Sequence, residues 1–111
     1  MNQEILDIQE RLMAGNVPPQ ELAEFRVRLS GWYSHYSGEM EEILARRPAM
    51  WRAIRASSEC KSDKSADRIY EGLEDGIKLM RLEIWLKSMG KMNSAISGLL
   101  ELKSNESRNN Y

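Results

Sequence analysis

The stretch that decides the fold runs from Ser62 to Lys103 and reads SDKSADRIYEGLEDGIKLMRLEIWLKSMGKMNSAISGLLELK. Its apolar residues recur three and four positions apart, which is the spacing of a helix. They form two series on different faces. The first is Ile69, Leu73, Ile77, Met80 and Ile84, and the second is Leu79, Leu82, Leu86, Met89, Asn93, Ile96 and Leu100. One series would make a helix with one buried stripe, so two series predict a helix covered on two sides.

The length of this stretch is compatible with two architectures. An unbroken helix over 62–103 would be roughly 63 Å long, whereas a compact domain of this size has a radius of gyration of about 13 Å. Either the helix breaks, with Gly90 as the candidate position, or the molecule is elongated and the second apolar face meets another copy. We favour the second and predict a homo-oligomer whose interface is formed by Leu82, Trp85, Leu86, Met89 and Ile96.

The sequence before this stretch predicts two helices. The spacing of apolar side chains predicts a short helix over 3–13, carried by Ile5, Ile8 and Leu12. Gly15 and Asn16 end it, because both tolerate the left-handed conformation of a helix C-cap. Pro19 suits the first turn of the next helix. A near-heptad stripe then predicts a second helix over 19–46, with Leu22, Phe25, Leu29, Trp32, Tyr36 and Ile43.

Pro48 is expected to end this second helix, because the residue before a proline disfavours the helical region. A short helix over 48–55 follows, then a polar connector, and either Ser62 or Ser65 is the candidate N-cap for a helix over 62–103. The last residues, 105–111, have no apolar period and are predicted to form a frayed polar tail.

Together these elements predict an all-α fold in one domain over 1–104. We expect an elongated helical bundle that resembles an antiparallel coiled-coil hairpin, with one long C-terminal helix. The single cysteine, Cys60, excludes an internal disulfide and fits a reducing compartment. The longest run without charged residues, 29–38, is too short to cross a bilayer. We therefore expect a cytoplasmic protein with no membrane partner.

The net charge of the chain is −1, but the charged residues are distributed unevenly along it. Residues 1–45 carry three basic and eight acidic residues, a net charge of −5. Residues 46–68, here called the basic segment, carry seven basic and three acidic residues, a net charge of +4. Arginines interleaved with an aromatic residue suit phosphate contacts and base stacking. The alternative is a solvated face that pairs with the acidic first helices. The candidate nucleic-acid-binding residues are Arg47, Trp51, Arg52, Arg55, Lys61, Lys64 and Arg68.

No motif of a known enzyme class is present in the sequence. Lys61 and Lys64 could lower the pKa of the Cys60 thiol, but the one histidine, His35, lies on another predicted helix. One histidine makes no recognised metal-ligand spacing with the other residues. We expect a protein that is not an enzyme and that holds no metal and no cofactor.

Two glycines, Gly72 and Gly76, stand one helical turn apart in the long stretch. Each weakens a helix by about 1 kcal/mol relative to alanine. This cost predicts a packing reason, which we take to be the close approach of another helix. A hinge is the alternative.

Several short motifs carry a resemblance: Lys61–Arg68, Glu71-Gly72, Asp75-Gly76 and Leu86–Ile96. With them, residues 20–105 resemble small helical proteins encoded by tailed bacteriophages, in the neighbourhood of recombination and replication genes. The resemblance implies an accessory role in the cytoplasm of the host cell and defines no catalytic residue. It implies either work on nucleic acid or interference with a host defence protein.

The leading hypothesis is a non-enzymatic phage-type accessory protein that associates with nucleic acid in recombination or replication through the basic segment. One alternative is an anti-defence inhibitor of the anti-CRISPR kind, which would bind a host protein with its acidic first half. Another is a structural assembly component.

Overall fold

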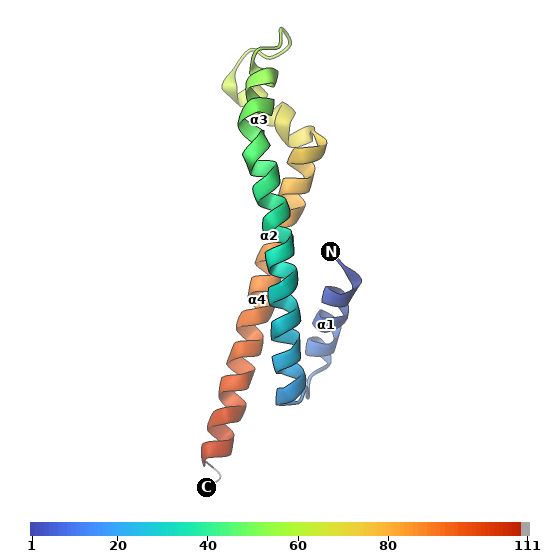
Figure 1. Cartoon of the computed structure of the whole chain (residues 1–111), viewed down its shortest axis with the longest axis vertical. Coiled ribbons are helices and arrows are strands. Elements are labelled where there is room, and N and C mark those ends of the chain that lie inside the picture. The colour runs from blue at the N-terminus through green and yellow to red at the C-terminus, as the bar shows by residue number, and fades with distance from the viewer. Residues whose placement is uncertain (110–111) are drawn as a thin grey trace. The chain divides into compact units, whose positions relative to one another are not determined.

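The structure is a computed structural model that describes residues 1–109, and every regular element in that range is a helix. The order is α1 (Gln3–Ala14), α2 (Pro19–Arg55), α3 (Asp63–Gly72) and α4 (Glu74–Asn109) (Figure 1). The all-α prediction is confirmed, and the last helix is a long one.

The helices pack as two compact units, where the sequence predicts one domain over 1–104. The α1 unit consists of Met1–Ser34 and the part of α4 from Trp85 onward. The α3 unit consists of His35–Ile84. Because α2 and α4 run through both units, each supplies one segment to each core.

In the α1 unit, α1 has a defined start and stop. The side-chain oxygen of Asn2 accepts a hydrogen bond from the backbone N–H of Ile5, at 3.2 Å, which satisfies one of the unpaired donors of the first turn. At the other end Gly15 has φ 81° and Asn16 has φ 57°. Both lie in the left-handed region that glycine and asparagine tolerate best. The predicted helix over 3–13 and its C-terminal stop are confirmed, with one residue more.

The core of the α1 unit is apolar and comes from all three of its helical segments. Its buried side chains are Ile5, Ile8, Val17, Leu22, Leu29, Leu86, Met89, Met92 and Ile96. Met89 and Ile96 are 0% exposed. Trp85, in the same unit, is half-buried, and Leu82, in the α3 unit, is 0% exposed. The prediction that Leu82, Trp85, Leu86, Met89 and Ile96 form an interface with a second copy is therefore wrong, because packing within the chain already removes this face from solvent.

Figure 1 shows α1 beside the first half of α2, and polar side chains join these two helices. Arg11 donates two hydrogen bonds to the carboxylate of Glu21, at 3.1 and 3.2 Å. Glu4 accepts hydrogen bonds from Arg28 and from the indole N–H of Trp32, at 3.3 and 2.8 Å. Two acids of the first 45 residues, Glu4 and Glu21, are thus paired inside the unit.

The second helix does not end before Pro48. α2 continues to Arg55, so the predicted end at residue 46 and the separate helix over 48–55 are wrong. Proline removes one backbone hydrogen bond and costs about 3 kcal/mol in a helix interior. Pro48 is exposed, so water can reach the carbonyl that it leaves unpaired. Contacts on both sides of Pro48, from Arg46 to Asp75 and from Trp51 to Asp67, hold the helix together.

The helix predicted over 62–103 is broken in the structure. Ser62 caps α3 as expected, since its hydroxyl accepts a hydrogen bond from the backbone N–H of Ser65 at 3.1 Å. Leu73, at φ −78° and ψ 163°, is extended and separates α3 from α4. Gly90 lies inside an unbroken stretch of α4. The prediction of one continuous helix is wrong, and so is Gly90 as the position of a break.

Gly76 explains how the two helices can meet so closely. A Cβ atom at this position would lie 2.1 Å from the carbonyl oxygen of Tyr70 and 2.8 Å from the Cα of Glu71. The first turn of α4 therefore packs directly against the last turn of α3. A close approach was expected here, but the neighbour is the preceding helix of the same chain. A Cβ at Gly72 would meet nothing within 4 Å.

The C-terminal residues are more helical than the sequence predicts. The frayed tail was expected over 105–111, whereas α4 continues to Asn109. Residues 110–111 lie outside the described part of the chain.

Candidate functional site

The basic segment lies in the α3 unit, where α3 folds back beside the end of α2. The Nε of Arg55 donates a hydrogen bond to Asp63, at 2.9 Å. One helical turn further along α3, Asp67 accepts a hydrogen bond from the indole N–H of Trp51, at 2.8 Å. These contacts occupy the polar edge of Trp51 and the guanidinium of Arg55, both of which are candidate nucleic-acid-binding residues.

Arg46, at the start of the basic segment, makes a two-pronged ion pair with Asp75 of α4. Its nitrogens donate hydrogen bonds to both carboxylate oxygens, at 2.6 and 2.8 Å, the geometry in which an arginine–carboxylate pair is strongest. These bonds hold the pKa of Asp75 below its usual range and raise the pKa of Arg46. The Asp75 side chain is 15% exposed. The pair ties the start of α4 to α2.

Arg47 is held differently from its neighbour. Its guanidinium carbon lies 5.0 Å from the centre of the Tyr70 ring, within the range of a cation–π contact. Arg47 is half-buried. Its guanidinium is therefore only partly accessible to a nucleic acid.

Four candidate residues remain exposed: Arg52, Lys61, Lys64 and Arg68. None of them makes an ion pair within residues 1–109, unlike Arg46 and Arg55. Lys64 and Arg68 stand one turn apart on α3, so they lie on one face of it. The structure therefore divides the predicted site. Arg47, Trp51 and Arg55 are engaged in contacts within the unit, and the other four cations face solvent.

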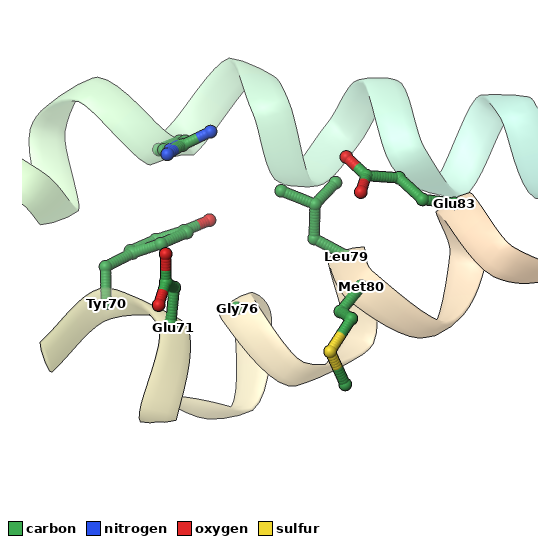
Figure 2. Close-up of a pocket in the computed structure, with 7 residues that line it drawn as sticks. Tyr70, Glu71, Gly76, Leu79, Met80 and Glu83 are labelled. Carbon is green, nitrogen blue, oxygen red and sulfur yellow. The ribbon is translucent and has the colours of Figure 1, made fainter. Parts of the chain in front are cut away.

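A hollow of about 280 Å³ lies between α2, α3 and α4 within the α3 unit. Figure 2 shows its lining residues: Arg47, Tyr70, Glu71, Gly76, Leu79, Met80 and Glu83. Tyr70 is 1% exposed, and its hydroxyl has no hydrogen-bond partner within the described part of the chain. A buried hydroxyl without a partner is costly, and a polar hollow of this size can hold a water molecule. The sequence analysis missed Tyr70, and no local sequence signal marks it.

A row of large apolar side chains stays exposed on α3 and α4. This row, here called the apolar stripe, is the first of the two series: Ile69, Leu73, Ile77, Met80 and Ile84. Its members are between 36% and 60% exposed. Figure 2 shows that two neighbouring side chains point in opposite directions: Leu79 points toward α2, and Met80 points away from it. Both series were found in the sequence, but the unpaired face was assigned to the wrong one.

Cys60 is buried, whereas His35 is exposed. The buried Cys60 donates a hydrogen bond from Sγ to the carbonyl of Ser62, at 3.3 Å. His35 is exposed and lies 3.5 Å from a carboxylate oxygen of Glu39. Over residues 1–109 no group of three or more His, Cys, Asp and Glu residues could hold a metal ion. No described helix is long and apolar enough to cross a membrane.

Comparison with known proteins adds no relative to this description. No family model matches the chain, and neither a curated protein nor a solved structure is similar to it. The function is therefore inferred from the residues of this chain and their contacts.

Proposed function

We propose that the protein is a non-enzymatic accessory protein that associates with nucleic acid through the basic segment. The observation that carries the proposal is a set of four exposed cations that have no acidic partner among residues 1–109: Arg52, Lys61, Lys64 and Arg68. Basic side chains that face solvent can neutralise phosphates and release their counterions. A role in phage-type recombination or replication is part of the proposal and rests on the sequence resemblance.

The contacts of the other three candidates narrow the mode of binding. Trp51 donates its indole N–H to Asp67 and is half-buried, so we assign it to holding α3 on α2 and not to base stacking. Arg55 serves the same purpose through Asp63. The four exposed cations would contact phosphates. Such contacts position a nucleic acid without reading its sequence.

A binding titration at two salt concentrations tests the proposal. The variant Arg52→Gln/Arg68→Gln removes two exposed cations of the basic segment, and Arg26→Gln/Lys87→Gln removes two exposed cations elsewhere, with the same change in net charge. For double-stranded DNA we expect the first variant to bind more weakly and to lower the salt slope by about 1.8.

The control variant should bind like the wild type, and circular dichroism should show the same helix content in all three proteins. Absence of binding to DNA and RNA at low salt would overturn the proposal. An equal loss in both variants would show an effect of net charge alone and would remove the basic segment as the site.

The anti-defence inhibitor remains the alternative, with a host protein as its partner. It depends on the acidic first half, where Glu4 and Glu21 are already paired with Arg28 and Arg11. It predicts little nucleic-acid binding by the protein alone and a complex with a host protein that Glu→Lys changes in residues 1–45 weaken. A structural assembly component would show neither property.

A further inference from the structure

Two hydrogen-bond donors at the hollow of the α3 unit lack an acceptor. The hydroxyl of Tyr70 is buried and has no partner within residues 1–109. Arg47 is half-buried, and over the same residues its guanidinium contacts the Tyr70 ring but no carboxylate. A donor that is withdrawn from water and left without an acceptor lowers the stability of a fold. Such a pair of donors is therefore suited to a bound molecule that carries the acceptor.

Both donors lie at the same end of the hollow. The guanidinium carbon of Arg47 lies 5.0 Å from the centre of the Tyr70 ring. Figure 2 shows the Tyr70 hydroxyl pointing away from the backbone of α3, toward the side on which Leu79 lies. The volume of the hollow, about 280 Å³, is close to the lower limit of the pockets that hold small molecules. It is thus large enough for a small organic ligand and for more than one water molecule.

We propose that this hollow binds a small α-amino acid with an apolar side chain. The carboxylate of the ligand accepts hydrogen bonds from the Tyr70 hydroxyl and from the Arg47 guanidinium, whose planar donors match the two oxygens of a carboxylate. Leu79 and Met80 also line the hollow and offer apolar surface to the side chain of the ligand. The site is separate from the four exposed cations of the basic segment.

Two glutamates in the lining set the charge of the ligand. Glu71 and Glu83 are exposed, and neither forms an ion pair within residues 1–109. With one arginine and two glutamates, the lining repels a ligand with two negative charges, such as a phosphate ester. An ammonium group next to the carboxylate of the ligand is attracted by the glutamates and removes this repulsion. The lining therefore favours a zwitterion over a simple carboxylate.

Thermal unfolding with three matched probes tests the site. Leucine, isocaproate and isoamylamine share one branched carbon chain, but isocaproate lacks the ammonium group and isoamylamine lacks the carboxylate. A ligand that binds only the folded state raises the melting temperature. Leucine at about ten times its dissociation constant should raise it by about 5 °C. Isocaproate at the same concentration should raise it less, and isoamylamine should leave it unchanged.

Two variants assign the effect to the donors. Tyr70→Phe removes only the hydroxyl and Arg47→Gln removes the positive charge, so each should abolish the rise with leucine. Because the hydroxyl has no partner within residues 1–109, Tyr70→Phe should not lower the melting temperature of the protein without ligand. The matched controls are Tyr33→Phe and Arg52→Gln, at exposed residues outside the hollow. Both controls should respond to leucine like the wild type.

Three outcomes would contradict the proposal. No rise in melting temperature with leucine or isocaproate at millimolar concentration would overturn it and leave the hollow to water. A full rise with leucine in Tyr70→Phe would also overturn it, because the ligand would then lie elsewhere, and this variant decides alone if Arg47→Gln does not fold. Isocaproate that binds as tightly as leucine would overturn the amino-acid class, because Glu71 and Glu83 would then make no contribution.

Discussion

The two series of α3 and α4 both consist mainly of large apolar residues three or four positions apart, but their surroundings are opposite. Leu82 and Met89, of the second series, are fully buried. Met80 and Ile84, of the first, are more than half exposed. The difference is the presence of α2, which covers one face of α4 and leaves the other open. Spacing thus shows that a face is apolar, whereas the rest of the fold decides what covers it.

Truncation of one residue from each series should give the largest contrast. Leu82→Ala leaves a cavity in the core and should lower the free energy of unfolding by about 2–5 kcal/mol. Ile84→Ala removes a side chain that is already 60% exposed and should cost less than about 1 kcal/mol. Urea unfolding of the two variants measures both free-energy changes. A similar cost for the two variants would contradict the assignment of buried and open faces.

Two glycines of α4 offer a second contrast, between a crowded position and an open one. Alanine stabilises an exposed helix interior by about 0.5–1 kcal/mol relative to glycine. Gly90→Ala should show this gain, since a Cβ there meets nothing within 4 Å. Gly76→Ala should instead destabilise by about 1–3 kcal/mol, because its Cβ would strike the backbone of Tyr70. Thermal unfolding of the two variants checks the opposite signs.

A stabilising effect of alanine at both glycines would mean that α3 and α4 do not pack closely at Gly76.

The break between α3 and α4 could be predicted only in part from the sequence. Gly72 and Gly76 signalled a packing constraint, but Leu73 is a good helix former and the stretch 62–103 contains no proline. Local propensity therefore favoured a continuous helix, and tertiary contacts decided against it.

At Pro48 local propensity and tertiary contacts also disagree, but here the tertiary contacts keep the helix continuous. The sequence rule predicts a helix end there, yet α2 continues because contacts of Arg46 and Trp51 hold the helix on both sides of Pro48.

The candidate nucleic-acid-binding site could also be predicted only in part from the sequence. The positive charge of residues 46–68 is visible in the sequence. Which cations face solvent depends on how α3 folds back on α2, since that step pairs Arg55 with Asp63.

The smallest effect concerns pH and the ion pair between Arg46 and Asp75. The pKa of Asp75 is lower in the folded chain than the usual value of about 3.9 in an unfolded one. The unfolded state therefore binds the proton more readily, and stability falls as the pH drops. The contribution of Asp75 is complete above about pH 3.9 and is lost as the pH falls through the lowered folded-state pKa. Asp75→Asn should remove this part of the acid dependence.

Exposure of the pair to solvent limits the size of the effect, because water and salt screen such contacts. Arg55→Gln gives a matched control, since it breaks the pair with the more exposed Asp63 and leaves the pair between Arg46 and Asp75 in place. Acid titrations of the melting temperature should therefore show a shallower decline for Asp75→Asn than for Arg55→Gln. Identical acid profiles for the two variants would contradict the assignment of Asp75 as the carboxylate that ties α4 to α2.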